Sequence, residues 1–275
     1  MFPAFLLGAL VSAAPVASPA PALTPQRILG SIRATFRSHR PPPPYVTYTL
    51  IRAQLTDQGF PDYVESYTYH IWCRTSDRAA LARKVFRDTA RGPLEFQRPA
   101  FNEPRDPGPP TADLFEPAPL HPHPIEFVPT PEPAETTLPT IATVTSIGEF
   151  DYRVTAMDAE GPLLHLQIEP TRDPERNRLR ELWVDKRSYE LRKLVATDKL
   201  FVEHDRVYGV TFTIVLGSLQ GYPIVTDIHG EVGDNYSGDG ENVDFHFRDV
   251  AFPPSLPAWY FDPHAYGAHE NDAPL

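Results

Sequence analysis

Two Asp-x-His triplets lie close together in the last quarter of the chain, and they are its best candidates for chemistry. Asp227 and His229 precede a loop rich in Gly and Asp, and Asp244 and His246 follow it. If residues 233–240 form the loop of a β-hairpin, Asp227 lies opposite His246 and His229 lies opposite Asp244, with Cβ atoms about 5 Å apart. Two imidazoles and two carboxylates on one face could ligate zinc or a similar ion, so one alternative is a metal-dependent hydrolase.

The same four residues also fit the polar face of an ordinary hairpin. They alternate with Ile228, Phe245 and Phe247, whose side chains point the other way. A polar outer face opposite an apolar inner face is what any half-buried strand shows. The two pairs would then be cross-strand ion pairs when the histidines are protonated. We favour this interpretation, and expect no catalytic residue, no metal and no cofactor.

Other catalytic signatures are missing from the sequence. There is no G-x-S-x-G, no G-x-x-x-x-G-K-[ST] and no H-E-x-x-H pattern. The sole cysteine, Cys73, lies in an alternating segment without an evident base partner, so we expect a small buried residue rather than a nucleophile. A net charge of -11 argues against nucleic acid as a partner, because phosphate binding is driven by a cationic surface.

The N-terminal residues are typical of a secretory signal peptide. An apolar run from Phe2 to Ala14 is too short to cross a bilayer, and Ala20-Pro21-Ala22 offers a small-x-small cleavage site. We therefore expect residues 1–22 to be removed and the mature protein to lie in the periplasm or to be secreted.

One helix followed by many strands is expected from the hydrophobic periodicity. Thr24 and Pro25 are a good helix start, and Ile28, Ile32 and Phe36 give one apolar stripe before the prolines at 41–44. Period-two segments then predict strands at 45–51, 63–70, 140–144, 152–157, 163–169, 200–208, 211–216, 222–231 and 242–250, with a hairpin over 180–195 and a strand or short helix at 81–86. This order indicates an antiparallel meander or barrel with a helix packed on one face.

The prolines are concentrated in one segment of the chain. It makes up 33 of the 275 residues, and more than a third of these lie at about 99–139, where no periodicity is sustained. We expect a long irregular insertion there, since proline fixes φ and lacks a backbone donor. The expected organisation is a single β-domain over 23–262 carrying this insertion, followed by a loose polar tail at 263–275.

Three motifs in order resemble a known family. They are the helix TPQRILGSIRATF, the tyrosine-rich strand YVTYTLIRAQL and the hairpin LRELWVDKRSYELRKLVATD, and the ending VDFHFRDVAFPPSLPAWYF agrees with them. The chain is similar to the LolA/LolB-like outer-membrane lipoprotein carrier (lipoprotein-sorting) superfamily. The resemblance implies an α+β, mainly antiparallel fold: an unclosed half β-barrel with the N-terminal helix on its face. The family's central helical lid is replaced here by the Pro-rich insertion.

The resemblance further implies a non-catalytic carrier of a lipid, a lipoprotein acyl chain or another hydrophobic ligand, with a lipidated protein or an envelope membrane protein as possible partner. Strand alternation supplies candidates for the lining of an apolar concave cavity, although the same residues could form a filled core. The candidates are Phe212, Ile214, Leu216, Ile224, Ile228, Val243, Phe245 and Phe247. A further alternative is a cell-envelope interaction module that acts through the Pro-rich flap.

Overall fold

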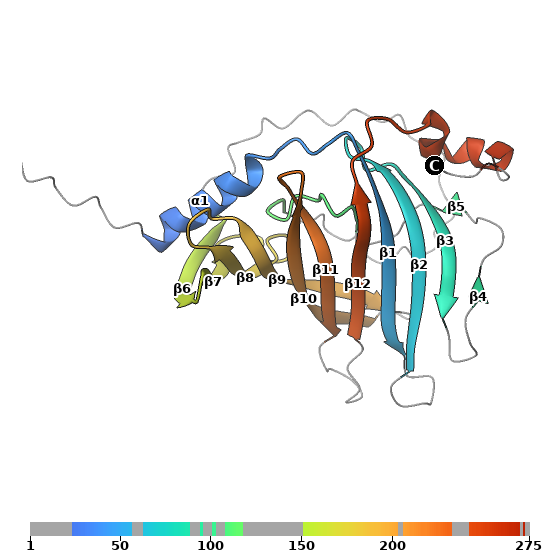
Figure 1. Ribbon diagram of the computed structural model, residues 1–275. Helices are drawn as coiled ribbons and strands as arrows, with labels where there is room; N and C mark the ends of the chain where they lie inside the picture. Colours follow the sequence, from blue (N-terminus) through green and yellow to red (C-terminus); the bar gives the residue numbers. More distant parts are fainter. Residues whose placement is uncertain are drawn as a thin grey trace, which may run out of the picture.

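The computed structural model of the protein describes residues 24–56, 63–88, 94–95, 101–102, 108–117, 151–202, 206–232, 242–269 and 272. These residues form one long curved antiparallel sheet, with helix α1 lying across one end of it (Figure 1). The predicted signal peptide at 1–22 and the predicted strand at 140–144 lie outside the described residues. Within the described ranges, no helix is long and apolar enough to cross a membrane.

Helix α1 (Pro25–Arg37) begins and ends where its sequence signals place it. Thr24 is the N-cap, and its hydroxyl accepts a hydrogen bond from the Arg27 backbone N at 3.3 Å. This bond satisfies one of the amide groups that a helix start leaves without an intrahelical acceptor. The apolar stripe is buried as predicted, including Ile28, Ile32 and Phe36.

The strands follow the predicted alternation closely. Their bounds are β1 (Tyr45–Thr56), β2 (Tyr63–Arg74), β3 (Ala80–Asp88), β4 (Leu94–Glu95), β5 (Phe101–Asn102), β6 (Tyr152–Glu160), β7 (Leu163–Pro170), β8 (Leu179–Asp185), β9 (Leu191–Val202), β10 (Arg206–Leu219), β11 (Tyr222–Val232) and β12 (Asn242–Ala251). One prediction is wrong: residues 200–208 are not a single strand, because β9 ends and β10 begins there, with Arg206 paired to Val202. The predicted segment therefore contains the end of one strand and the start of its antiparallel neighbour.

The sheet is unclosed. Its order is β4-β3-β2-β1-β12-β11-β10-β9-β8-β7-β6, with β5 pairing β3, so β4 and β6 end the path without pairing to each other. Sequence neighbours pair from β1 to β4 and from β6 to β12, and β1 also pairs with β12. The predicted fold class, an open antiparallel half-barrel with an N-terminal helix packed on its face, is confirmed.

Two clusters of buried side chains line the inner, concave face. The first lies between α1 and strands β6–β9, and contains Leu29, Ile32 and Leu182 among others. The second lies on β1–β3, β11 and β12, and contains Leu50, Ile71 and Phe245 among others. The helix thus covers one half of the sheet, while the other half presents its apolar side chains to the concavity.

The C-terminal residues form two 3-10 helices. The 3-10 helices η1 (Ala258–Phe261) and η2 (Pro263–His269) lie beside the outer face of β2 and β3. Tyr260 is buried against Trp72 and Leu81, and His269 stacks on Trp259 with ring centroids 4.3 Å apart. Trp72 and Leu81 form an apolar patch on the outer face that η1 covers, whereas η2 has no buried residue. The loose tail at 263–275 stays a prediction.

Candidate functional site

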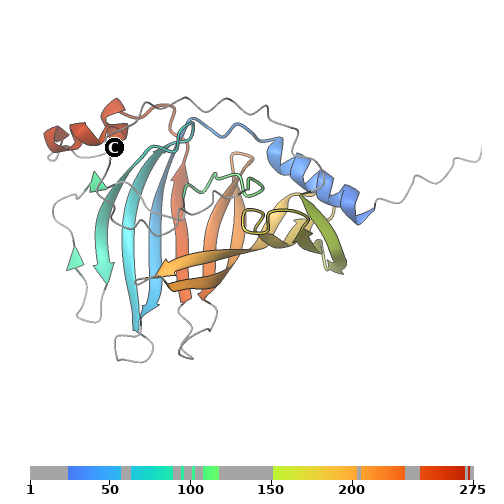
Figure 2. The same ribbon diagram turned by 180° about the vertical axis from the view of Figure 1, so that it is seen from behind.

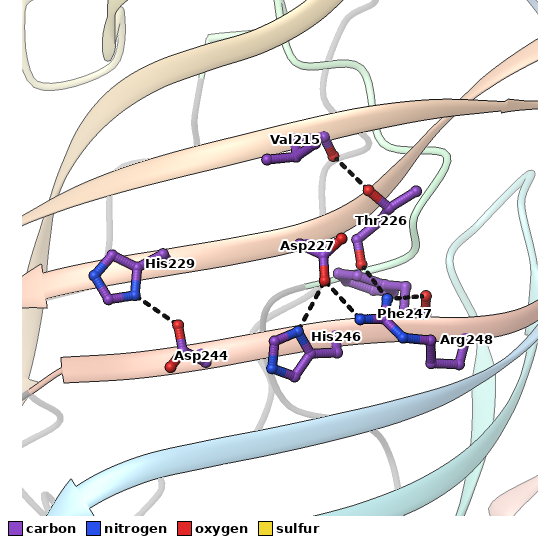
Figure 3. Close-up of polar contacts among 8 residues, drawn as sticks. All are labelled: Val215, Thr226, Asp227, His229, Asp244, His246, Phe247 and Arg248. Carbon is purple, nitrogen blue, oxygen red and sulfur yellow. Dashed lines mark hydrogen bonds and ion pairs between the residues drawn. The ribbon is translucent and has the colours of Figure 1, made fainter.

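The predicted register of the Asp/His hairpin is confirmed. Asp227 pairs with His246 and His229 pairs with Asp244 across β11 and β12. His229 Nδ1 lies 2.6 Å from Asp244 Oδ1, and His246 Nδ1 lies 2.8 Å from Asp227 Oδ1. All four side chains project from the outer face of the sheet (Figure 3).

Arg248 joins one of the two pairs. Its Nη2 donates to Asp227 Oδ1 at 2.8 Å, and its Nη1 donates to the Thr226 carbonyl at 3.1 Å (Figure 3). Partial burial raises the pKa of Asp227, but the hydrogen bonds from Arg248 and His246 outweigh it and hold this pKa below its usual value. Asp227 is therefore a stable anion and not a candidate proton donor near neutral pH.

The geometry favours two separate ion pairs over a shared metal site. Each imidazole contacts its own carboxylate, and the side chains are 36% to 42% exposed. Exposed pairs of this kind contribute about 0.2–1 kcal/mol. The described part of the chain contains no group of three or more His, Cys, Asp or Glu side chains placed to hold a metal ion.

The inner face of the same sheet carries the apolar candidates other than Ile224. Six of the eight are buried: Leu216, Ile224, Ile228, Val243, Phe245 and Phe247. Phe212 and Ile214 are half-buried and pack against the clusters. Gly230 lies beneath Phe212, since a Cβ at Gly230 would come within 2.7 Å of that ring. The aromatic ring therefore lies close against the sheet.

A β-bulge changes which residues share this face. Val215 pairs with Asp227 and Leu216 pairs with Val225, so Thr226 is the extra residue. Val225, rather than Ile224, therefore joins Ile228 in the buried cluster. Ile224 therefore does not share the inner face with Ile228, because simple alternation does not continue through a bulge.

Part of the Pro-rich insertion packs onto the concave face, which sequence reasoning missed. Segment 108–117 (green in Figure 2) lies beside α1 and the start of β11. Phe115 is 3% exposed and meets Phe36 edge-on, with ring centroids 5.5 Å apart. Leu114 packs against both buried clusters. The adjacent apolar pair Leu114-Phe115 within a polar, Pro-rich stretch is the sequence feature that could have predicted this packing.

Polar contacts also hold segment 108–117. Arg40 donates to the carbonyl oxygens of Thr111 and Ala112, each at 2.8 Å. The Val225 backbone N donates to the Pro110 carbonyl at 2.8 Å. These ten residues are thus used for internal packing; the rest of the predicted insertion lies outside the described residues, apart from 101–102 in β5.

The concavity next to α1 is largely filled. A hollow of about 30 Å³ lies between the helix and the β10–β11 turn, with Phe36, His39 and Pro223 in its wall. This volume suits about one water molecule and is far below that of a ligand pocket.

Cys73 is buried on the inner face, as expected. It is 1% exposed, and burial raises the pKa of its thiol to about 11. The thiolate is the nucleophilic form of cysteine, so a raised pKa disfavours covalent catalysis at this residue.

Comparisons with known proteins find only distant similarity. No known family model matches the chain, and no curated protein sequence matches it either. Among solved structures, a LolA superfamily protein from Nitrosomonas europaea is 12% identical, with 86% of this chain and 97% of that chain covered and a TM-score of 0.36. A DUF1329 family protein from Desulfovibrio piger is 10% identical, with 86% and 98% covered and a TM-score of 0.38.

A third similar structure is described as an outer membrane lipoprotein-sorting protein domain from Vibrio parahaemolyticus. It is 9% identical, with 87% of this chain and 97% of that chain covered and a TM-score of 0.36.

Proposed function

We propose that this protein is a non-catalytic carrier or binding protein for a lipid, a lipoprotein acyl chain or a similar hydrophobic ligand. It acts in the periplasm or outside the cell after removal of residues 1–22. Its partners are lipids or lipidated proteins.

The apolar inner face of an unclosed sheet carries this proposal. Adjacent strands place Leu50 beside Phe247, and Phe245 beside Ile228, so the apolar surface continues across β1, β12 and β11. It extends to β10, where Ile214 pairs with Ile228 and Phe212 lies against Gly230. The outer face of the same strands is polar, with two Asp–His pairs.

The driving force for binding follows from this surface. Each CH₂ group buried from water contributes about 0.8 kcal/mol, before the cost of ordering the ligand. A long acyl chain can therefore bind if it contacts the inner face over much of its length. Phe212 is suited to contact it, because its ring is only half-buried and lies on β10 toward the concavity.

The proposal is tested by native mass spectrometry and lipid extraction of the protein purified from its envelope fraction, together with titration of a fluorescent fatty acid. We expect a co-purifying lipid and saturable binding. Phe212→Ser removes an inner-face ring and weakens binding about tenfold. Val215→Ser is the matched control, because Val215 lies on β10 with its side chain outward and 39% exposed.

Two results contradict the proposal. In the first, no lipid co-purifies and the wild-type protein does not bind the probe. In the second, Val215→Ser lowers binding as much as Phe212→Ser, which would place the ligand away from the inner face. N-terminal sequencing of the exported protein tests the predicted removal of residues 1–22.

A further inference from the structure

Strand β6 ends the sheet on the side opposite β4, and a side chain satisfies part of its edge (Figure 1). The Gln26 side-chain amide, in the first turn of α1, donates a hydrogen bond to the Tyr152 carbonyl at 2.8 Å. The Gln26 side-chain oxygen accepts a hydrogen bond from the Val154 backbone N at 3.2 Å. These are the contacts that the main chain of a neighbouring strand would make, so the β6 edge accepts peptide-like groups.

These two hydrogen bonds show which main-chain groups of β6 point away from β7. Every second residue of an antiparallel strand directs its N–H and C=O groups to the same side, and here Val154 directs its N–H to the edge. Thr155 is an extra residue, because the β6–β7 register shifts between Val154 and Ala156. Beyond this bulge, alternation directs the N–H and C=O groups of Met157 and Ala159 to the edge.

The side chains around Met157 and Ala159 differ between the two faces of the sheet. On the inner face, Met157 and Leu164 are partly buried and pack against the first apolar cluster. On the outer face, Asp158 lies opposite His165 of β7, and it is exposed. A strand added at this edge would therefore meet apolar side chains on one face and a carboxylate on the other.

Glu160 is a second carboxylate on the outer face of β6. One of its oxygens accepts a hydrogen bond from the Trp183 indole N at 3.1 Å, and the other lies 3.2 Å from His165 Nδ1. These contacts hold Glu160 beside the exposed Asp158. The net charge of the chain, -11, has the same sign, so the overall field also favours the approach of a cationic partner.

A second copy of the chain is a poor occupant of this edge. Antiparallel pairing of two β6 strands through all the outward main-chain groups would set Met157 of one copy opposite Ala159 of the other. The same register sets Asp158 directly opposite its own counterpart, and like charges at such positions are destabilising. A charge on an edge strand thus opposes self-pairing, whereas it attracts a strand of the opposite charge.

We propose that the β6 edge, residues 156–160, is a docking site for an extended, basic segment of a protein partner, which joins the sheet as a further strand. Met157 and Ala159 exchange main-chain hydrogen bonds with this segment. Its apolar side chains lie beside Met157 and Leu164 on the inner face, and its Lys or Arg side chains lie beside Asp158 on the outer face. This inference goes beyond the proposed function, because it requires no bound lipid.

The probe for this site is a fluorescein-labelled peptide of alternating lysine and valine, compared with a peptide of alternating glutamate and valine. We expect titration by fluorescence anisotropy to show saturable binding of the lysine peptide, about tenfold or more tighter than binding of the glutamate peptide. Bound peptide should slow amide hydrogen exchange at Met157 and Ala159 about tenfold. Exchange at Asp158 should change little, because alternation directs its N–H toward β7.

N-methylation of the peptide separates strand addition from simple charge attraction. In antiparallel addition the valine N–H groups point toward β6, whereas in parallel addition the lysine N–H groups do. We expect methylation of one set to abolish binding and methylation of the other set to preserve it, because only one set donates to β6.

Variants assign the binding to β6. Ala159→Pro removes one outward N–H, and proline is tolerated on an edge strand where its position needs no ladder hydrogen bond, so a folded protein with about tenfold weaker binding is expected. Asp158→Lys should abolish the preference for the lysine peptide. Glu231→Lys is the matched control, since it makes the same change in net charge at an exposed position on β11 and should leave the preference nearly unchanged. If Ala159→Pro does not fold, the methylated peptides test the same contact.

Three results overturn the proposed docking site. They are the absence of saturable binding of the lysine peptide to the wild-type protein, equal binding of the two methylated peptides, and an equal effect of Glu231→Lys and Asp158→Lys on the preference. The last result would indicate attraction by net charge alone. These titrations use no lipid, so their failure leaves the proposed function in place, and a failure to bind lipid leaves the docking site in place.

Discussion

Phe115→Ala tests whether segment 108–117 is an integral part of the fold. Phe115 is 3% exposed, its ring meets Phe36 edge-on at 5.5 Å, and the Arg33 guanidinium lies 6.0 Å from its centroid. Truncation of a buried phenylalanine to alanine costs about 3–5 kcal/mol, through lost transfer energy and the cavity that remains. The edge-on pair accounts for about 0.5–1.5 kcal/mol beyond the buried area.

The effect of Phe115→Ala depends on the other contacts that hold segment 108–117 in place. The two hydrogen bonds from Arg40 to Thr111 and Ala112, and the one from Val225 to Pro110, together contribute a few kcal/mol at about 0.5–3 kcal/mol each. Loss of Phe115 removes a comparable amount. We therefore expect segment 108–117 to detach in a large fraction of molecules. The sheet should stay folded, because the segment takes no part in the pairing of β1 with β12 that joins the two ends of the domain.

The assay combines urea denaturation, limited proteolysis and titration with an apolar dye. We expect a loss of about 3 kcal/mol in unfolding free energy, faster cleavage within 108–117 and increased dye binding. Glu116→Ala is the matched control: Glu116 pairs with Arg78 at 2.9 Å, but both side chains are more than half exposed, so a change under about 1 kcal/mol is expected. A Phe115→Ala protein as stable and as protease-resistant as the wild type would refute the packing described.

Three further predictions concern other buried or paired groups. Asp151→Asn removes the charge of a 2%-exposed carboxylate that accepts a hydrogen bond from Arg172 Nε at 2.6 Å and faces the buried Arg33 guanidinium at 3.9 Å. Urea denaturation should show a loss of about 3 kcal/mol, and a loss under about 0.5 kcal/mol would refute the importance of these two contacts. The hydrogen bond from Arg74 lowers the pKa of Asp77 to about 2 in the folded state, so this carboxylate adds stability above its unfolded pKa near 4 and loses it as the pH falls toward 2. The difference in melting temperature between wild type and Asp77→Asn should therefore shrink from pH 6 to pH 2, and a constant difference would contradict the assignment. Cys73, with a pKa raised to about 11 by burial, should react with iodoacetamide at pH 8 only when the protein is unfolded; mass spectrometry showing rapid labelling of the native protein would contradict its burial.

Local features of the sequence determine much of this fold. Thr24 and Pro25 set the start of α1 because capping depends on adjacent residues only. The pairing of Asp227 with His246, and of His229 with Asp244, follows from a hairpin in which loop length fixes the register. The same alternation separates the polar outer face from the apolar inner face without knowledge of any distant contact.

Tertiary structure decides the features that depend on distant or irregular contacts. The pairing of β1 with β12 joins segments at opposite ends of the domain, and no local pattern specifies which edges meet. The bulge at Thr226 depends on how β10 and β11 bend together, and it moves Ile224 away from the face of Ile228. Segment 108–117 lacks a repeating pattern, so its packing is set by the shape of the concavity beside α1.

The residues around Tyr67 on the inner face of β1–β3 show both contributions in one place. Alternation alone puts Tyr67 and Tyr69 on one face of β2, because they are two residues apart in a strand. Only the assembled sheet brings Arg52 and Arg87 to either side of Tyr67, since each comes from a different strand and Arg87 requires a bulge to face inward. Sequence thus determined the two faces of the sheet, whereas the register and bulges between strands decided which charges meet on them.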